Sequence, residues 1–143
     1  MPYHFLDDIA TADVAFEAWG ETVEEMFVAA ADATMNVMVS DLNTIEHRES
    51  RTLQVESHAM DMLLFELLQE LIYYKDADLL LLRVRDVLIT ERDDHFSLSA
   101  EAYGEQLSSE KHDLVVDVKA VTLHRFRVEQ TSKGWEATVI LDI

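Results

Sequence analysis

Two kinds of hydrophobic spacing divide this chain into strands and helices. Alternating apolar positions, in which every second side chain faces the same way, predict strands. The first such run is "ADVAFEAWG", where Val14, Phe16 and Ala18 share one face and Gly20 ends the strand. Further runs of this kind, bounded by polar turns, predict strands at 51–57, 79–91, 95–105, 117–130 and 135–143.

Helical spacing is found in two longer segments. In 21–41 apolar residues recur every three or four positions, and Thr22 followed by Glu25 forms a capping-box pattern. The segment 57–75 has a wide apolar face, and Ser57 is placed to cap its first turn. We therefore predict one helix in each segment.

The order of these elements predicts an α+β fold, with two helices packed on one antiparallel sheet or on a pair of sheets. The regular strand and helix alternation of a doubly wound fold is missing. A chain of 143 residues with 49% hydrophobic content can bury one sizeable core. Linkers are short, and we find no internal repeat and no domain boundary, so we expect a single domain spanning 1–143.

The net charge of the chain limits the kinds of molecule that it is expected to bind. The formal net charge is −18, from 29 acidic against 11 basic residues, which repels a phosphate backbone and argues against direct nucleic-acid binding. Most of this acidity serves solubility, so only acidic residues in unusual positions carry functional information. The apolar runs are too short and too interrupted by charge to cross a bilayer, and the start of the chain does not resemble a signal peptide. With no cysteine present, we expect a cytoplasmic protein without disulfides or thiolate metal sites.

Asp13 and Asp142 are acidic residues among apolar neighbours. Asp13 directly precedes the first strand, and Asp142 interrupts the last one between Leu141 and Ile143. A carboxylate in a partly apolar setting needs a cation or hydrogen-bond donors, and the carboxylate of Ile143 adds a further oxygen. Oxygen-only ligands suit a hard divalent ion such as Ca²⁺ or Mg²⁺. The alternative is that Asp13 caps a turn and Asp142 points into solvent. It stays open because sequence spacing alone does not show that the two residues meet.

Lys119 and His124 are the other unusual positions. Lys119 stands in an apolar stretch, either as a lysine whose stem lies along the surface or as a charge partner of Asp13, of Asp142 or of another protein. His124 is interpreted as a core histidine or as a residue lining the same site. No histidine pair has the spacing of a zinc site, and no phosphate loop or nucleophile motif is present.

Several short motifs together resemble the archease family along essentially the whole chain. None of them is specific alone, but their order and spacing match. They are Thr11-Ala12-Asp13, "AWG" at 18–20, "TVEEMF" at 22–27, "LLFELLQELIYYKD" at 63–76, "AYGE" at 102–105, Lys111 with His112, "VKAVTLH" at 118–124 and the closing "LDI".

The resemblance implies a non-catalytic protein cofactor of the tRNA-splicing ligase RtcB. Such proteins promote guanylylation of the ligase and allow multiple turnover. They also bind a divalent cation, usually Ca²⁺, with Mg²⁺ or Mn²⁺ as alternatives. Carried over to this chain, the metal ligands are Asp13, Asp142 and Ile143, and the residues of partner activation are Asp13, Lys119 and Asp142. The chain departs from the family pattern at Ala10, where a histidine is frequent, and at Leu123, where a tyrosine is frequent.

Two other functions are compatible with the same residues. A metal-dependent hydrolase would use the bound ion to activate water, but the sequence offers no evident general base or nucleophile. A chaperone-like module would bind basic partners broadly through its acidic surface.

Overall fold

The computed structural model describes residues 2–6 and 13–143 of the chain. Within these ranges the elements, in chain order, are β1 (Tyr3–Leu6), β2 (Asp13–Gly20), α1 (Val23–Met38), the 3-10 helix η1 (Leu42–Thr44), β3 (Glu49–Ser57), α2 (Met60–Asp78), β4 (Leu80–Arg92), β5 (His95–Gln106), β6 (Ala120–Thr131) and β7 (Gly134–Asp142). The predicted strands and helices are all found. β1, which pairs with β2 from Tyr3 to Leu6, was not predicted.

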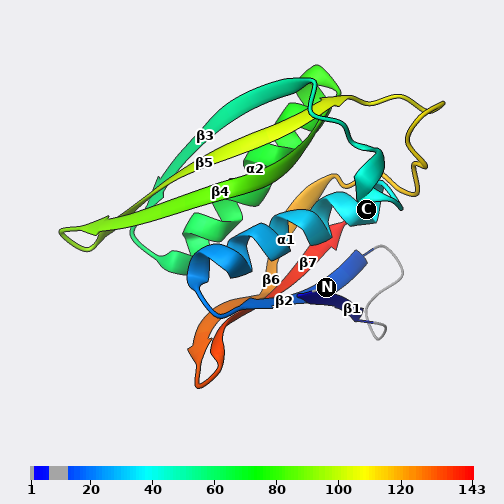
Figure 1. Cartoon of the computed structure of the whole chain (residues 1–143). Coiled ribbons are helices and arrows are strands. Elements are labelled where there is room, and N and C mark those ends of the chain that lie inside the picture. The colour runs from blue at the N-terminus through cyan, green and yellow to red at the C-terminus, as the bar shows by residue number, and fades with distance from the viewer. Residues whose placement is uncertain (1, 7–12) are drawn as a thin grey trace.

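The strands form two antiparallel sheets, and both helices pack against both of them (Figure 1). One sheet has the strand order β1-β2-β7-β6 and the other β3-β5-β4. α1 contacts β2 and β7 in the first sheet and β4 in the second, whereas α2 contacts β6 in the first and β3, β4 and β5 in the second. The predicted α+β class is confirmed, in the form with a pair of sheets.

Two-residue turns close the two long hairpins. Asp93 and Asp94 join β4 to β5 with φ angles of 53° and 59°, the left-handed conformation that a tight hairpin requires and that aspartate tolerates. The β6–β7 hairpin closes between Thr131 and Gly134. These local turns fix the register of both strand pairs.

The two helices begin differently. Thr22 caps α1 by accepting the N–H of Glu25 at 3.1 Å, and the Glu25 carboxylate accepts the N–H of Glu21 at 3.0 Å, so the predicted cap is confirmed. The predicted Ser57 cap of α2 is wrong. The cap position is Ala59, which makes no side-chain cap, and the Ser57 hydroxyl instead accepts the N–H of Ala59 at 3.4 Å. Packing of α2 between the sheets replaces the missing cap as its source of stability.

The core lies where the helices meet the inner faces of the sheets. Phe16 on β2, Phe27 on α1 and Leu67 on α2 are fully buried, and each such side chain contributes about 1.5–3 kcal/mol. The alanines of α1 are buried as well, which lets this helix approach both sheets closely. None of the helices in the described ranges has the length and apolar character needed to cross a bilayer.

Candidate functional site

The sheet places the two unusual aspartates opposite each other. Asp13, the first residue of β2, is the register partner of Asp142, the last residue of β7. Directly opposed residues in an antiparallel pair project from the same face, with Cβ atoms about 4.5–5.5 Å apart. Leu141 is fully buried on the helix-facing side, so the two half-buried aspartates belong to the outer face. Like charges in this arrangement repel each other, and a cation between them removes the repulsion.

Lys119 and Ile143 lie beside this pair. The main-chain N–H of Lys119 donates to the carbonyl oxygen of Asp142 at 2.8 Å, and the next residue, Ala120, is the register partner of Asp142. Lys119 directly precedes β6 and is exposed, and among the described residues no ion pair links it to Asp13 or Asp142. Ile143 is half-buried against the core, which holds the end of the described chain next to Asp142.

The atoms available at this site are oxygens, the type of ligand that a hard cation binds. The two carboxylates and the main-chain oxygen of Ile143 are all oxygen ligands, as Ca²⁺ and Mg²⁺ require. Within residues 2–6 and 13–143, no group of three or more His, Cys, Asp or Glu side chains is placed to hold a metal ion. A cation here would therefore depend on main-chain oxygens and water as well as on the two aspartates. Asp7, Asp8, Ala10, Thr11 and Ala12 of the N-terminal motif lie outside the described residues.

A buried lysine anchors the segment that leads into this site. The Lys75 side chain on α2 is 5% exposed, and its ammonium donates to the Val118 carbonyl at 2.9 Å and to the carboxylates of Asp76 and Asp117. Burial opposes the charge on this ammonium, but the two aspartates outweigh burial and raise the Lys75 pKa above its ordinary value. Because Val118 directly precedes Lys119, Lys75 fixes the backbone that meets Asp142.

A second buried cluster of charged residues holds the start of the loop 107–119, whose end is held by Lys75. Glu105 at the end of β5 is 7% exposed and accepts the N–H of Glu46 and the Lys111 ammonium, each at 2.8 Å. His112 Nδ1 accepts the N–H of Ser108 at 2.9 Å, so the neutral ring carries its proton on Nε2 and donates it to Glu105 at 3.1 Å. The motif residues of "AYGE" and "KH" therefore shape the 107–119 loop.

Because of Glu105, we expect the free energy of unfolding to depend on pH. Burial opposes its ionisation, but the Glu46 N–H, Lys111 and His112 outweigh this effect and lower its pKa to about 2, from an ordinary value of 4.5. The unfolded chain therefore takes up this proton first, so the stabilisation is complete above pH 4.5 and is lost as the pH falls toward 2. We expect Glu105→Gln to lower the free energy of unfolding by about 2 kcal/mol at pH 7, and by much less near pH 3.

Urea denaturation at both pH values measures this difference. Glu110→Gln, at an exposed position in the same loop, is the matched control and should change stability by less than about 0.5 kcal/mol. An effect of Glu105→Gln that is equal at both pH values would show that the charge of Glu105 is not what stabilises the fold.

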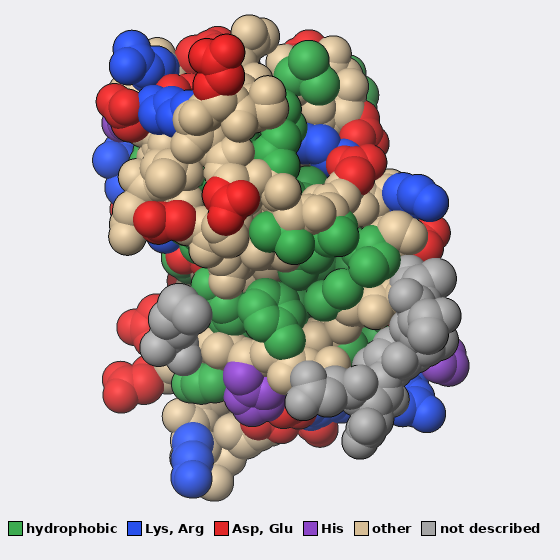
Figure 2. All heavy atoms as spheres, turned by 90° about the vertical axis from the view of Figure 1, so that its right-hand side faces the viewer, with side chains coloured by type: hydrophobic (Ala, Val, Ile, Leu, Met, Phe, Trp, Pro, Cys, Tyr) green, Lys and Arg blue, Asp and Glu red, His purple; other side chains and the backbone are tan. Residues whose placement is uncertain are grey.

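The loop between Glu105 and Lys119 also carries exposed apolar side chains. The exposed residues are Leu114, Val115 and Val116, at 39%, 58% and 39%. The main chain of this segment is nevertheless held to α1, because the Val115 N–H donates to the Met38 carbonyl at 2.9 Å. Figure 1 shows this loop and the C-terminus on the same side, and Figure 2 shows on that side a band of hydrophobic side chains with acidic and basic groups around it. An apolar surface with a polar rim is typical of a protein interface.

The remaining sequence predictions near this site have mixed outcomes. His124 is exposed, so its interpretation as a core histidine is wrong. The register of β6 and β7 is irregular between Thr122 and Arg127, and this irregular segment turns His124 and Leu123 outward. The motifs at 63–76 and 102–105 contain Lys75 and Glu105, but sequence reasoning gave neither residue a role. A single base at the end of the apolar face of α2 is a usable signal for Lys75.

Comparisons with known proteins agree with this architecture. The model of the family described as "Archease protein family (MTH1598/TM1083)" matches residues 3–143. The archease of Pyrococcus abyssi is 37% identical over 134 residues, covering 93% of this chain and 94% of that one. The archease of Methanosarcina mazei is 35% identical over 142 residues, covering 99% and 95%.

Two solved structures share the fold. The solution structure of Methanobacterium thermoautotrophicum protein 1598 superposes with a TM-score of 0.84 at 35% identity, covering 99% of both chains. A crystal structure from Thermotoga maritima, described as an archease and possible chaperone, has a TM-score of 0.62 at 15% identity and covers 98% of both chains, which supports the fold alone. The fold is thus that of a small α+β protein with two helices between antiparallel sheets. The chain belongs to the archease family.

Proposed function

We propose that this protein is a cofactor of the tRNA-splicing ligase RtcB and promotes its guanylylation and multiple turnover in tRNA splicing and RNA repair. The observation that carries the proposal is the pairing of Asp13 with Asp142 at the sheet end, beside Lys119 and Ile143. Residues from both ends of the described chain converge there, and they are the residues that the family resemblance assigns to metal binding and activation. The proposed ion is Ca²⁺, with Mg²⁺ or Mn²⁺ as alternatives.

The residues around Asp13 and Asp142 support a role in docking to a protein better than a role in catalysis. The proposed role is non-enzymatic, in the cytoplasm, without direct binding of nucleic acid. The net charge of −18 favours a basic protein partner, and the exposed apolar residues Leu114, Val115 and Val116 offer an adjacent contact surface. A hydrolase would need a positioned base or nucleophile at the ion, and within residues 2–6 and 13–143 no group of three or more His, Cys, Asp or Glu side chains gathers at Asp13 and Asp142.

Guanylylation of RtcB with GTP tests this function. We expect the protein to accelerate transfer of labelled GMP to the ligase, and unrelated basic proteins to show no comparable binding to it. The absence of acceleration by folded, Ca²⁺-loaded protein would contradict the proposal. Equal binding to the ligase and to unrelated basic proteins would favour the chaperone-like function.

The same assay with metal-stripped protein separates two mechanisms of activation. Stimulation that persists without the ion would exclude metal delivery and favour electrostatic steering by the two aspartates.

A further inference from the structure

A small hollow, which we call the loop hollow, lies between the loop 107–119 and the C-terminal ends of α1 and α2. It has a volume of about 210 Å³ and is lined by Met38, Lys75, Leu107, Leu114, Val115, Val116 and Asp117. Most of these side chains are apolar, and three of them are the exposed apolar residues of the loop. The exposed apolar surface and the hollow are therefore one feature.

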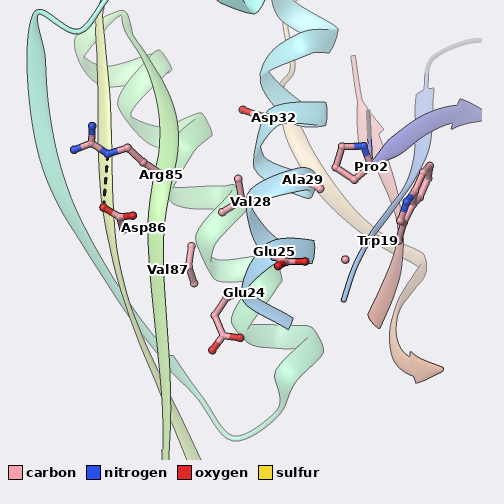
Figure 3. A pocket seen from close by; sticks show the side chains of 11 residues that line it. Pro2, Trp19, Glu24, Glu25, Val28, Ala29, Asp32, Arg85, Asp86 and Val87 are labelled. Atoms are coloured by element: carbon pink, nitrogen blue, oxygen red, sulfur yellow. Dashed lines mark ion pairs between the residues drawn. The ribbon is translucent and has the colours of Figure 1, made fainter. Parts of the chain in front are cut away.

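A larger hollow, of about 600 Å³, lies elsewhere, between α1 and β4 (Figure 3). Its lining is mixed, because Glu24, Arg85 and Asp86 lie there beside Val87. Arg85 and Asp86 also contact each other, at 3.6 Å. The loop hollow has a mainly apolar lining instead, so an apolar group displaces its water more favourably.

The backbone that carries the exposed apolar residues is fixed at several points. The Ser40 N–H donates to the Asp113 carbonyl at 3.0 Å, and the Ser40 hydroxyl donates to the Asp113 carboxylate at 2.7 Å. Leu114 and Val39 form an isolated β-bridge. The apolar side chains are thus held in place before a partner binds, which reduces the entropy that binding must overcome.

The loop hollow has carboxylates at its edge. Asp76 and Asp117 both accept from the buried Lys75 ammonium, and their side chains are 55% and 67% exposed. One lysine neutralises only one of the two charges, so a negative charge remains beside the hollow. Basic residues of a partner are therefore attracted to this edge.

The loop hollow lies close to the aspartate pair. Val116 is three residues before Lys119, so their Cα atoms are at most about 11 Å apart. The Lys119 N–H donates to the Asp142 carbonyl at 2.8 Å, which joins the loop to the last strand. A partner that covers the apolar residues with an interface of standard size, about 800 Å², therefore also reaches the aspartate pair.

We propose that the loop hollow receives an apolar side chain of the partner ligase, flanked by basic residues, and that this contact supplies affinity while the aspartate pair supplies activation. The inference rests on the proposed function and divides it between two neighbouring surfaces. Apolar residues on a fixed backbone favour docking, because little ordering entropy is lost when they are covered. The carboxylates of Asp76 and Asp117 select the bases on the partner.

Titration of the protein into a guanylylation reaction of RtcB separates affinity from activation. We expect Val115→Ser with Val116→Ser to raise the concentration that gives half-maximal stimulation at least about tenfold, without lowering the maximal stimulation. Asp13→Asn should instead lower the maximal stimulation. Leu88→Ser removes a side chain that is 62% exposed on β4, and this control should behave as the wild type does.

The charge of the partner group is tested at Val115. Val115→Lys and Val115→Glu place long side chains of opposite charge at the same exposed position. We expect the ligase to bind Val115→Lys at least about threefold more weakly than Val115→Glu in a direct binding measurement on the folded proteins. The same two changes at Leu88 control for net charge, and their Kd values should differ by less than about 1.5-fold.

Two outcomes would overturn this inference and leave the proposed function in place. One is an unchanged half-maximal concentration for Val115→Ser with Val116→Ser while the wild type stimulates the ligase. The other is a difference between lysine and glutamate that is the same at positions 115 and 88. If the double variant does not fold, Val115→Ser alone takes its place, with an expected increase of at least about threefold. Folded wild-type protein that neither binds nor stimulates the ligase would overturn the proposed function, and this inference with it.

Discussion

Replacing Asp142 with asparagine is expected to abolish any stabilisation by calcium at the proposed site, while leaving the metal-free domain at least as stable as the wild type. Asp142 and Asp13 are register partners on one face of the sheet, so their charges repel when no cation is present. Asparagine keeps the shape of the side chain and removes the repulsion. Calcium at about 100 times its Kd stabilises a wild-type site by about 2.7 kcal/mol, which raises Tm by roughly 5–10 °C in a domain of this size.

Thermal unfolding with and without calcium measures both effects. Asp78→Asn, at an exposed position at the end of α2, is the matched control and should retain the full calcium shift. A calcium shift that persists in Asp142→Asn would show that this carboxylate is not a ligand. A metal-free variant that is markedly less stable than the wild type would instead show that Asp142 has a structural role.

Gly104→Ala is expected to prevent folding or to cost more than about 4 kcal/mol of stability. A Cβ atom at Gly104 would lie 1.7 Å from the carbonyl oxygen of Leu81 and 2.8 Å from its carbonyl carbon. Both atoms are main-chain atoms of β4, so no side-chain rotation relieves the clash. Gly104 is also paired with Glu49 in β3 and with Leu82 in β4, which prevents a shift of β5.

Circular dichroism and thermal unfolding of soluble protein check this expectation. Ala102→Gly, two residues earlier on the same strand, makes the opposite change and should cost only about 1 kcal/mol. A Gly104→Ala protein that unfolds at the wild-type temperature would contradict the close approach of β4 and β5.

Local patterns predicted the elements well because each is determined mainly by its own residues. Alternation located β2 and β7, and the polar residues between 79–91 and 95–105 located the turn between β4 and β5. The Thr22 cap followed from side-chain chemistry over three residues. β1 was missed because four residues carry too little pattern, and the Ser57 cap failed because the chain extends past Ser57 before α2 begins.

The candidate site depends on long-range pairing, which local patterns do not determine. Asp142 was identifiable as an acidic residue in an apolar strand, but its partnership with Asp13 follows from the order of β2 and β7 in the sheet. Lys75 and Glu105 were missed because their partners come from distant segments and are brought close only by folding. The assignment to RtcB rests on the family resemblance.

RNA ligation by RtcB with substrate in excess is the most direct test of whether the aspartate pair activates the ligase. The wild-type protein, Asp13→Asn and the control Asp78→Asn are compared after each is shown to be folded. We expect the wild type and Asp78→Asn to convert a single turnover into many, and Asp13→Asn to lose at least about tenfold of this stimulation. Full stimulation by Asp13→Asn, or none by the folded, calcium-loaded wild type, would contradict a role for the aspartate pair in activating the ligase.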